Sequence, residues 1–166
     1  MSRPLQAPAP HRTPYLRGLQ LALLSLIVCA CTGGVREIKG EAPLVSLGRL
    51  ELQAERLTLD LAIRNLNDQS FELSAVSLKV LLDEDPLARG RHEIPLHVSA
   101  RGREVLHLPM TATRAGLERL EQLAAGEVQQ LPWSLEATLF FVDAREHKTM
   151  TTGWLHRVPG QPGRFR

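Results

Sequence analysis

The sequence has few cysteines, few aromatic residues and almost no net charge. Only two of its 166 residues are cysteines, 4% are aromatic, and the formal net charge is +2. So small a charge does not indicate a nucleic-acid-binding protein. The main apolar run, residues 21–30, is half as long as the stretch of about 20 residues that a membrane-spanning helix needs. The composition therefore excludes a polytopic membrane protein and a collagen-like chain, and it suits one globular domain with some extra chain.

The N-terminal residues have the pattern of a bacterial lipoprotein signal peptide. Residues 1–20 contain three arginines and no acidic residue, and the apolar run follows at once. The segment Val28–Cys31 resembles a lipobox, in which a small residue precedes the cysteine that receives the lipid. This resemblance predicts residues 1–30 as a lipoprotein signal peptide and Cys31 as the lipidated N-terminus. Thr32 stands where an aspartate would signal retention in the inner membrane, so we expect anchoring at the periplasmic face of the outer membrane.

Cleavage before Cys31 changes the composition of the mature chain. It removes three of the 20 basic residues and none of the 18 acidic residues, which leaves a net charge of −1. Cys31 is then the one cysteine that remains in the mature chain. The exported domain therefore cannot form an internal disulfide and depends on its hydrophobic core. Residues 31–42 are rich in glycine and charge and are predicted to form a flexible tether. Residues 159–166, which are rich in proline and glycine, are predicted to be disordered.

The remaining residues, 43–158, show mainly the alternation of apolar and polar residues that is typical of β-strands. In residues 56–64, for example, leucines and an isoleucine fall at every second position. The apolar parity changes within residues 71–82, which predicts a bulge or a bend in that strand. Seven strands are expected, at residues 44–52, 56–64, 71–82, 92–98, 104–110, 132–142 and 148–158.

One segment has helical periodicity instead. Three leucines recur at spacings of three residues within residues 114–125, with Thr113 as the expected N-cap and Gly126 as the stop. About seven strands and one short helix predict a mainly β domain. We expect an antiparallel β-sandwich of the immunoglobulin or fibronectin III type.

A hairpin is expected between residues 92–98 and 104–110, with a three-residue loop. In that register His97 lies opposite His107 on the face away from the core, with Cβ atoms about 5 Å apart. Such a pair can share one transition-metal ion, although no third ligand can be assigned. The sequence therefore offers His97 and His107 as a candidate metal site, with two solvated surface histidines as the preferred interpretation. No cofactor is expected.

The order of these features resembles that of the late-embryogenesis-abundant (LEA) type 2 family, also called the WHy domain. The landmark of that family is an Asn-Pro-Asn turn after an alternating strand, and Asn65, Leu66 and Asn67 match it here. Pro109 would be the proline near the end of the family's hairpin, and the resemblance extends over residues 43–157. Leu66 replaces the family proline, so the φ angle of about −65° that proline imposes is not preset. The resemblance implies a fibronectin-like sandwich that protects against desiccation or stress without catalysis.

Two functions remain open at this point. The first is a non-enzymatic, membrane-anchored stress-protection domain, and the alternative is a periplasmic binding or scaffold module that recruits a protein partner or an apolar ligand. Phosphate-binding glycine loops, nucleophile elbows and paired zinc cysteines are absent from the sequence, so an enzyme is not expected. The expected partners are the lipid bilayer, through N-terminal acyl chains, and periplasmic protein clients, but no nucleic acid. Trp133 and Trp154 are expected to pack in the core.

Overall fold

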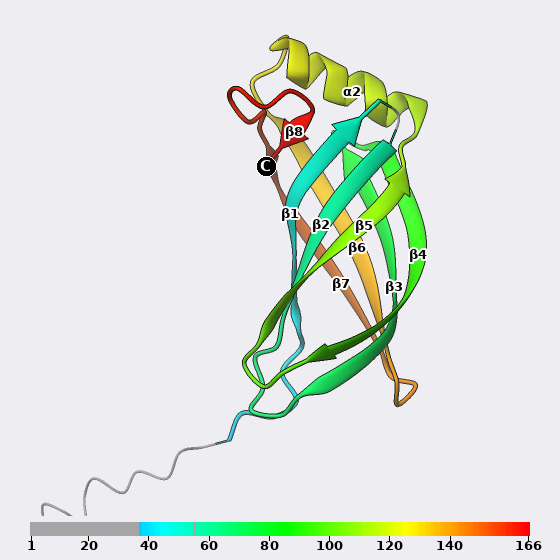
Figure 1. The fold of residues 1–166 in the computed structure, drawn as a ribbon, viewed down its shortest axis with the longest axis vertical. Coiled ribbons are helices and arrows are strands. Elements are labelled where there is room, and N and C mark those ends of the chain that lie inside the picture. The colour runs from blue at the N-terminus through cyan, green and yellow to red at the C-terminus, as the bar shows by residue number, and fades with distance from the viewer. Residues whose placement is uncertain (1–36, 55) are drawn as a thin grey trace, which may run out of the picture. The chain divides into compact units, whose positions relative to one another are not determined.

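The protein is described by a computed structural model that covers residues 37–54 and 56–166. These residues form two antiparallel four-stranded sheets packed face to face (Figure 1). The first sheet contains β1 (Leu44–Gln53), β2 (Arg56–Arg64), β5 (Arg103–Thr111) and β8 (Arg164–Phe165), in the order β5-β2-β1-β8. The second contains β3 (Phe71–Leu82), β4 (Asp85–Val98), β6 (Leu131–Phe141) and β7 (Glu146–Leu155), in the order β4-β3-β6-β7. The predicted antiparallel β-sandwich with one helix is confirmed.

The core lies between the two sheets and follows from the alternation in the sequence. In β2, Leu59, Leu61 and Ile63 are completely buried, because successive side chains of a strand point to opposite faces. The parity change in β3 is produced by a bulge, since the pairing with β4 and with β6 shifts register between Leu73 and Ala75. The bulge predicted in this strand is therefore confirmed.

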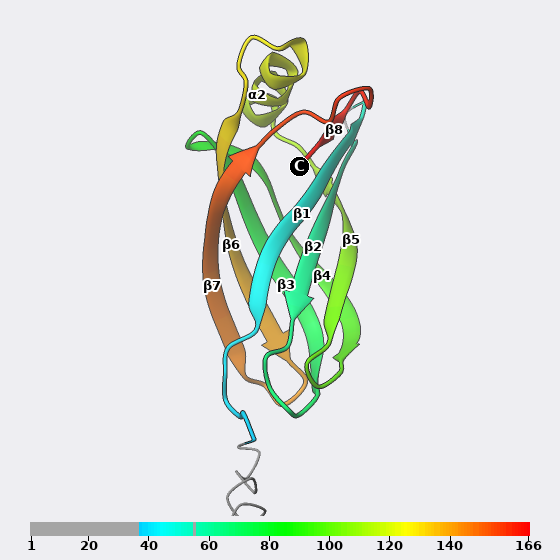
Figure 2. The ribbon, with the colours of Figure 1, turned by 90° about the vertical axis from the view of Figure 1, so that its left-hand side faces the viewer.

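The helix α2 (Arg114–Ala125) covers one end of the sandwich (Figure 2). The Thr113 hydroxyl accepts a hydrogen bond of 3.0 Å from the Gly116 N–H, and Gly126 ends the helix at a φ of 82°. Both predicted caps are confirmed. Leu120 and Leu123 are completely buried, so the apolar stripe of the helix closes this end of the core. Among the residues described, no helix is both long and apolar enough to cross a bilayer.

The predicted hairpin between residues 92–98 and 104–110 is wrong. β4 pairs with β3, and β5 pairs with β2 along its whole length, so the two segments belong to different sheets. Alternation predicts which face of a strand is buried but not which strand lies beside it. β4 also begins earlier than expected, at Asp85 instead of residue 92.

The predicted disordered tail is also wrong. Residues 164–165 form β8, which pairs with β1 through Leu50–Phe165 and Glu51–Arg164. The backbones of His156 and Arg166 also exchange hydrogen bonds of 2.8 and 2.9 Å. Phe165 is only 1% exposed, so burial of one aromatic ring orders a segment whose proline and glycine content indicated disorder.

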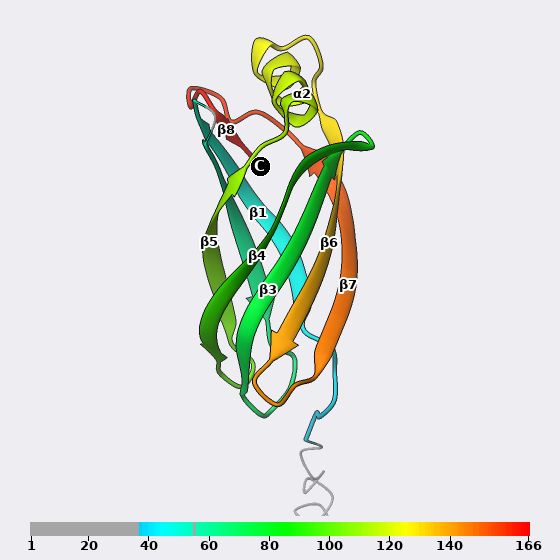
Figure 3. The same cartoon turned by 90° about the vertical axis from the view of Figure 1, so that its right-hand side faces the viewer.

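The connections between strands are divided between two ends of the sandwich (Figures 2 and 3). One end, here called the turn end, holds the turns at residues 65–70, 99–102 and 142–145 together with the N-terminal arm, residues 37–43. The opposite end, here called the helix end, holds α2, β8 and the C-terminus. The two ends carry different side chains, and the candidate site lies at the turn end.

Candidate functional site

The turn at residues 65–70 is organised by Asn65, which is the one completely buried polar side chain among the described residues. Its amide nitrogen donates to the backbone carbonyls of Gln69, at 2.7 Å, and Ser99, at 3.0 Å. Its side-chain oxygen accepts from the Asn67 N–H at 2.9 Å, which is the geometry of an Asx-turn. Asn65 thereby joins the turn after β2 to the turn after β4, and a hydrogen-bonded amide explains why a polar side chain is tolerated there.

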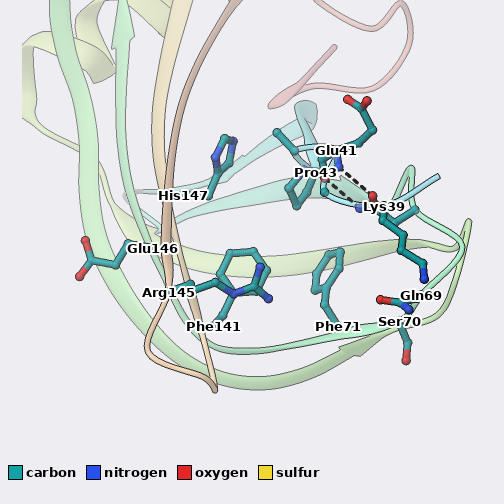
Figure 4. A pocket seen from close by; sticks show the side chains of 13 residues that line it. Lys39, Glu41, Pro43, Gln69, Ser70, Phe71, Phe141, Arg145, Glu146 and His147 are labelled. Atoms are coloured by element: carbon teal, nitrogen blue, oxygen red, sulfur yellow. Dashed lines mark hydrogen bonds between the residues drawn. The ribbon is translucent and has the colours of Figure 1, made fainter.

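The same turn holds the N-terminal arm through two reciprocal pairs of hydrogen bonds. The Glu41 N–H donates to the Asn67 side-chain oxygen at 2.8 Å, and the Asn67 amide nitrogen donates to the Glu41 carbonyl at 2.8 Å (Figure 4). Further along the arm, the Ile38 N–H donates to the Asp68 carboxylate at 2.6 Å, and the Asp68 N–H donates to the Ile38 carbonyl at 2.9 Å. The prediction of a flexible tether over residues 31–42 is thus wrong for residues 37–42, and its first residues lie outside the described part of the chain.

An ion pair reinforces this attachment of the arm. The Arg101 guanidinium donates to the Asp68 carboxylate at 2.7 Å, and the Arg101 N–H donates to the Asn67 carbonyl at 3.0 Å. The hydrogen bond from Arg101, followed by that from the Ile38 N–H, lowers the pKa of Asp68 below its ordinary value. Correspondingly, Asp68 raises the pKa of Arg101. Asp68 and Arg101 are therefore both charged at neutral pH. The Asp68 carboxylate can then accept from the Arg101 guanidinium and from the Ile38 N–H of the arm at the same time.

An open pocket of about 270 Å³ lies between the arm and the hairpin of β6 and β7 (Figure 4). Phe71 and Phe141 line it and meet edge to face, with ring centroids 5.4 Å apart. The Arg145 guanidinium lies 5.0 Å from the centre of the Phe141 ring and forms an ion pair of 2.7 Å with Asp143. This arrangement supports packing and a polar rim, and it brings together no nucleophile and general base within hydrogen-bonding distance.

The structure does not bring His97 and His107 together. His97 lies on β4 opposite Glu72, and its Nδ1 is 3.7 Å from that carboxylate. His107 lies on β5 in the other sheet, and its Nδ1 is 2.6 Å from Asp60. The register that placed the two histidines opposite each other is wrong because the hairpin is not formed. Within residues 37–54 and 56–166, no group of three or more His, Cys, Asp or Glu side chains is placed to hold a metal ion.

Of the other predicted site residues, Leu66 lies in the described part of the chain and Cys31 lies outside it. Leu66 lies between the two asparagines, half-buried, and its N–H makes none of the backbone hydrogen bonds found in the described turn. The lipid acceptor Cys31 and the signal peptide of residues 1–30 lie outside the described residues.

A second feature, which the sequence analysis missed, is the outer edge of β7. Trp154 is 56% exposed and Met150 is 63% exposed, so the expectation that Trp154 packs in the core is wrong. Both lie on the outer face of β7, and Trp154 lines an open groove of about 480 Å³ with Pro132 and Leu81. Alternation alone could not reveal this exposure, because it assigns the apolar residues of a strand to the core. In β7 some apolar residues lie on the outer face instead.

Among the described strands, none pairs with β7 on the side away from β6. The Phe141 N–H donates to the Arg145 carbonyl at the end of the hairpin, so odd-numbered residues of β7 face β6. Even-numbered residues from Glu146 to Trp154 therefore direct their N–H and C=O groups towards the free edge. His156 has the same parity, and on that side it pairs with Arg166, as this alternation requires.

Comparisons with known proteins bear on the fold. No protein-family model matches the sequence, and no curated protein matches it either. Among solved structures, the Arabidopsis thaliana protein AT1g01470 is 11% identical, with a TM-score of 0.53, over 78% of this chain and 93% of that chain. At2g46140.1, described as a late embryogenesis abundant protein, is 13% identical, with a TM-score of 0.49, over 86% of this chain and 88% of that chain. A protein from Archaeoglobus fulgidus is 12% identical, with a TM-score of 0.46, over 71% of this chain and 97% of that chain.

At these identities the comparisons bear on architecture alone. The likeness to AT1g01470 extends over nearly all of that chain, so the described domain shares the fold of that protein. The mainly β sandwich that the sequence predicted agrees with this likeness.

Proposed function

We propose that the protein is a non-catalytic lipoprotein that protects membranes or periplasmic proteins during desiccation or related stress. In this proposal Cys31 carries the lipid, and the sandwich lies on the periplasmic face of the outer membrane. The domain acts through its hydrated surface and by shielding clients, without turnover.

The observation that carries the proposal is the sandwich fold shared with AT1g01470, together with an asparagine turn that resembles the landmark of the LEA type 2 family. This turn is structured, since Asn65 is completely buried and hydrogen-bonded within its own turn and to the turn after β4. The lipobox-like segment before Cys31 supports membrane attachment. Several acyl chains, each contributing about 0.8 kcal/mol per buried methylene, would hold the domain stably at a bilayer.

Drying survival of the source bacterium tests the protective role. We expect a deletion strain to survive drying less well than its parent and the wild-type gene to restore survival. A Cys31→Ser variant should accumulate without lipid and restore survival only partly. Equal survival of the deletion strain and its parent would overturn the protective role, and an unacylated Cys31 in the mass spectrum of the mature protein would overturn the anchor.

The exposed edge of β7 favours a second candidate function, the recruitment of a protein partner. The edge is ten residues long, contains no proline or bulge, and carries exposed Met150 and Trp154. Unprotected edges of this kind pair with an added strand from another chain. If recruitment is the function, blocking this edge should abolish partner binding. If the domain protects through its hydrated surface, blocking the edge should leave protection intact.

A substitution at Met150 separates the two candidates. Met150→Pro removes an N–H on the free side and leaves the hydrogen bonds to β6 intact, whereas Thr151→Pro breaks them. If recruitment is the function, Met150→Pro should abolish crosslinking of a partner to a photoreactive side chain at Thr152 in intact cells. Retention of that crosslink, or its absence in the wild type, would argue against recruitment by this edge.

A further inference from the structure

The turn end determines where the chain leaves the sandwich on its way to Cys31. The arm is attached at Glu41 and again at Ile38, by backbone groups that bond to Asn67 and Asp68. These contacts come from residues about 30 positions away in the sequence, as the 30-residue separation of Ile38 and Asp68 shows. The chain is therefore anchored to the folded domain as early as Ile38, and not at the start of β1.

The distance between this attachment and Cys31 is limited by covalent geometry. Seven peptide units separate Cys31 from Ile38, and at the full extension of a chain they span at most about 25 Å. The strands are longer than this, since the twelve residues of β3 rise by about 40 Å. Whatever its conformation, the segment before Ile38 cannot bring the acyl chains past the turn end to the helix end.

The surface of the turn end suits contact with uncharged or zwitterionic lipid headgroups. Exposed apolar side chains project there from the arm, from the start of β1 and from the β6–β7 turn: Ile38 is 38% exposed, Leu44 53% and Val142 63%. The basic residues within the turns and the arm are paired with acidic ones, Arg101 with Asp68, Arg145 with Asp143 and Lys39 with Glu37, at 2.7 Å in each case. Arg64 and Arg103 flank these turns at the ends of β2 and β5 and are exposed. Because the charges of the turns and the arm are paired within the domain, these segments make no strong demand for anionic lipids.

We infer that the turn end, with Val142 at its tip, rests against the bilayer that holds the domain's own acyl chains. The inference rests on the proposed lipid anchor at Cys31. It adds an orientation to that anchor, with the helix end and the groove at Trp154 directed away from the membrane.

Tryptophan fluorescence in vesicles tests this orientation, because both natural tryptophans lie near the helix end. The full chain is produced with its signal peptide, and the acylated product is placed in phosphatidylcholine vesicles that contain a headgroup spin-label quencher. Val142→Trp, in a background where Trp133 and Trp154 are replaced by phenylalanine, reports on the turn end. Gln129→Trp in the same background is the matched control at the helix end.

We expect Val142→Trp to lose most of its emission to the quencher and Gln129→Trp to keep it. Adding phosphatidylglycerol should leave the difference unchanged. Insertion of about 20 glycine and serine residues after Gly34 lengthens the reach without touching the fold, and it should remove most of the quenching at position 142. If the phenylalanine background does not fold, the natural chain should show unquenched emission, and Val142→Trp alone should add a quenched component.

Failure of the anchor and failure of the orientation give different results. If the full chain, produced with its signal peptide, is recovered without acyl chains and does not sediment with vesicles, the anchor is overturned, and the orientation with it. Acylated protein that sediments but is quenched equally at positions 129 and 142 would overturn the orientation and leave the anchor standing. Quenching at position 142 that survives the insertion would show that the short chain segment is not its cause, and would also overturn the inference.

Discussion

Substitution of Asn65 by alanine is expected to lower the stability of the domain substantially. The change removes three hydrogen bonds with backbone groups, two donated and one accepted from the Asn67 N–H, and a longer one of 3.2 Å accepted from the Asn67 side chain, all at a side chain that is 0% exposed. A net contribution of about 1 kcal/mol for each of the three bonds to backbone groups predicts a loss of about 3 kcal/mol. For a domain of this size the loss corresponds to a fall in Tm of about 10 °C.

Urea unfolding followed by circular dichroism measures the loss, as a decrease in the midpoint concentration at constant slope. Gln69→Ala is the matched control in the same turn, since its side chain is exposed and its backbone carbonyl, which Asn65 bonds, is retained. The control should change stability by no more than about 0.5 kcal/mol. A loss below about 1 kcal/mol for Asn65→Ala would refute the reasoning that the buried amide organises the turn end.

Three further changes test other parts of the structure. Phe165→Ala should lower the free energy of unfolding by about 3 kcal/mol, measured by urea unfolding, because the ring is 1% exposed; a neutral result would return the C-terminal segment to disorder. Leu66→Pro should raise that free energy by about 0.5 kcal/mol through a less flexible unfolded chain, and a lower thermal midpoint would show that the turn does not accept the family proline. The lowered pKa of Asp68 means that its contribution is complete above the ordinary value of 3.8 and is lost only as the pH falls through the lower folded value. Hydrogen exchange at the Ile38 amide, corrected for intrinsic rates, should therefore lose protection only in strong acid, and a change between pH 5 and pH 7, well above that value, would contradict the assignment.

The sequence predicted the strands and the helix well because their signals are local. Alternation marked the buried faces, and the parity change in β3 indicated the bulge that the register shift at Leu73 shows. The caps of α2 follow from Thr113 and Gly126 for the same reason. Pairing is a different kind of information, because it depends on which strands meet in space. Segments 92–98 and 104–110 are adjacent in the chain and both alternate, yet they lie in opposite sheets.

The candidate site shows the same limit more strongly. The sequence identified Asn65 and Asn67 as turn residues, but their partners lie on the arm and in the turn after β4, 26 and 34 positions away. No periodicity links such positions. The order of the tail is equally hidden, since it depends on a single phenylalanine reaching the core beside β1. Composition predicts disorder there because it describes the proline and glycine content of the whole segment and does not register the burial of the single Phe165 ring.

The asparagine turn couples the stability of the sandwich to the position of its N-terminal arm. Asn65 bonds only within the turns, whereas the Asn67 side chain bonds both Asn65 and the Glu41 backbone. A substitution at Asn65 therefore disturbs the fold and the arm together, and it cannot assign a defect to either one. Asn67→Ala keeps the buried amide and removes the two side-chain bonds to Glu41, so it should release the arm while costing less stability. If Asn67→Ala already lowers survival after drying, the position of the arm matters for protection. If only Asn65→Ala lowers survival, the folded surface is what protects.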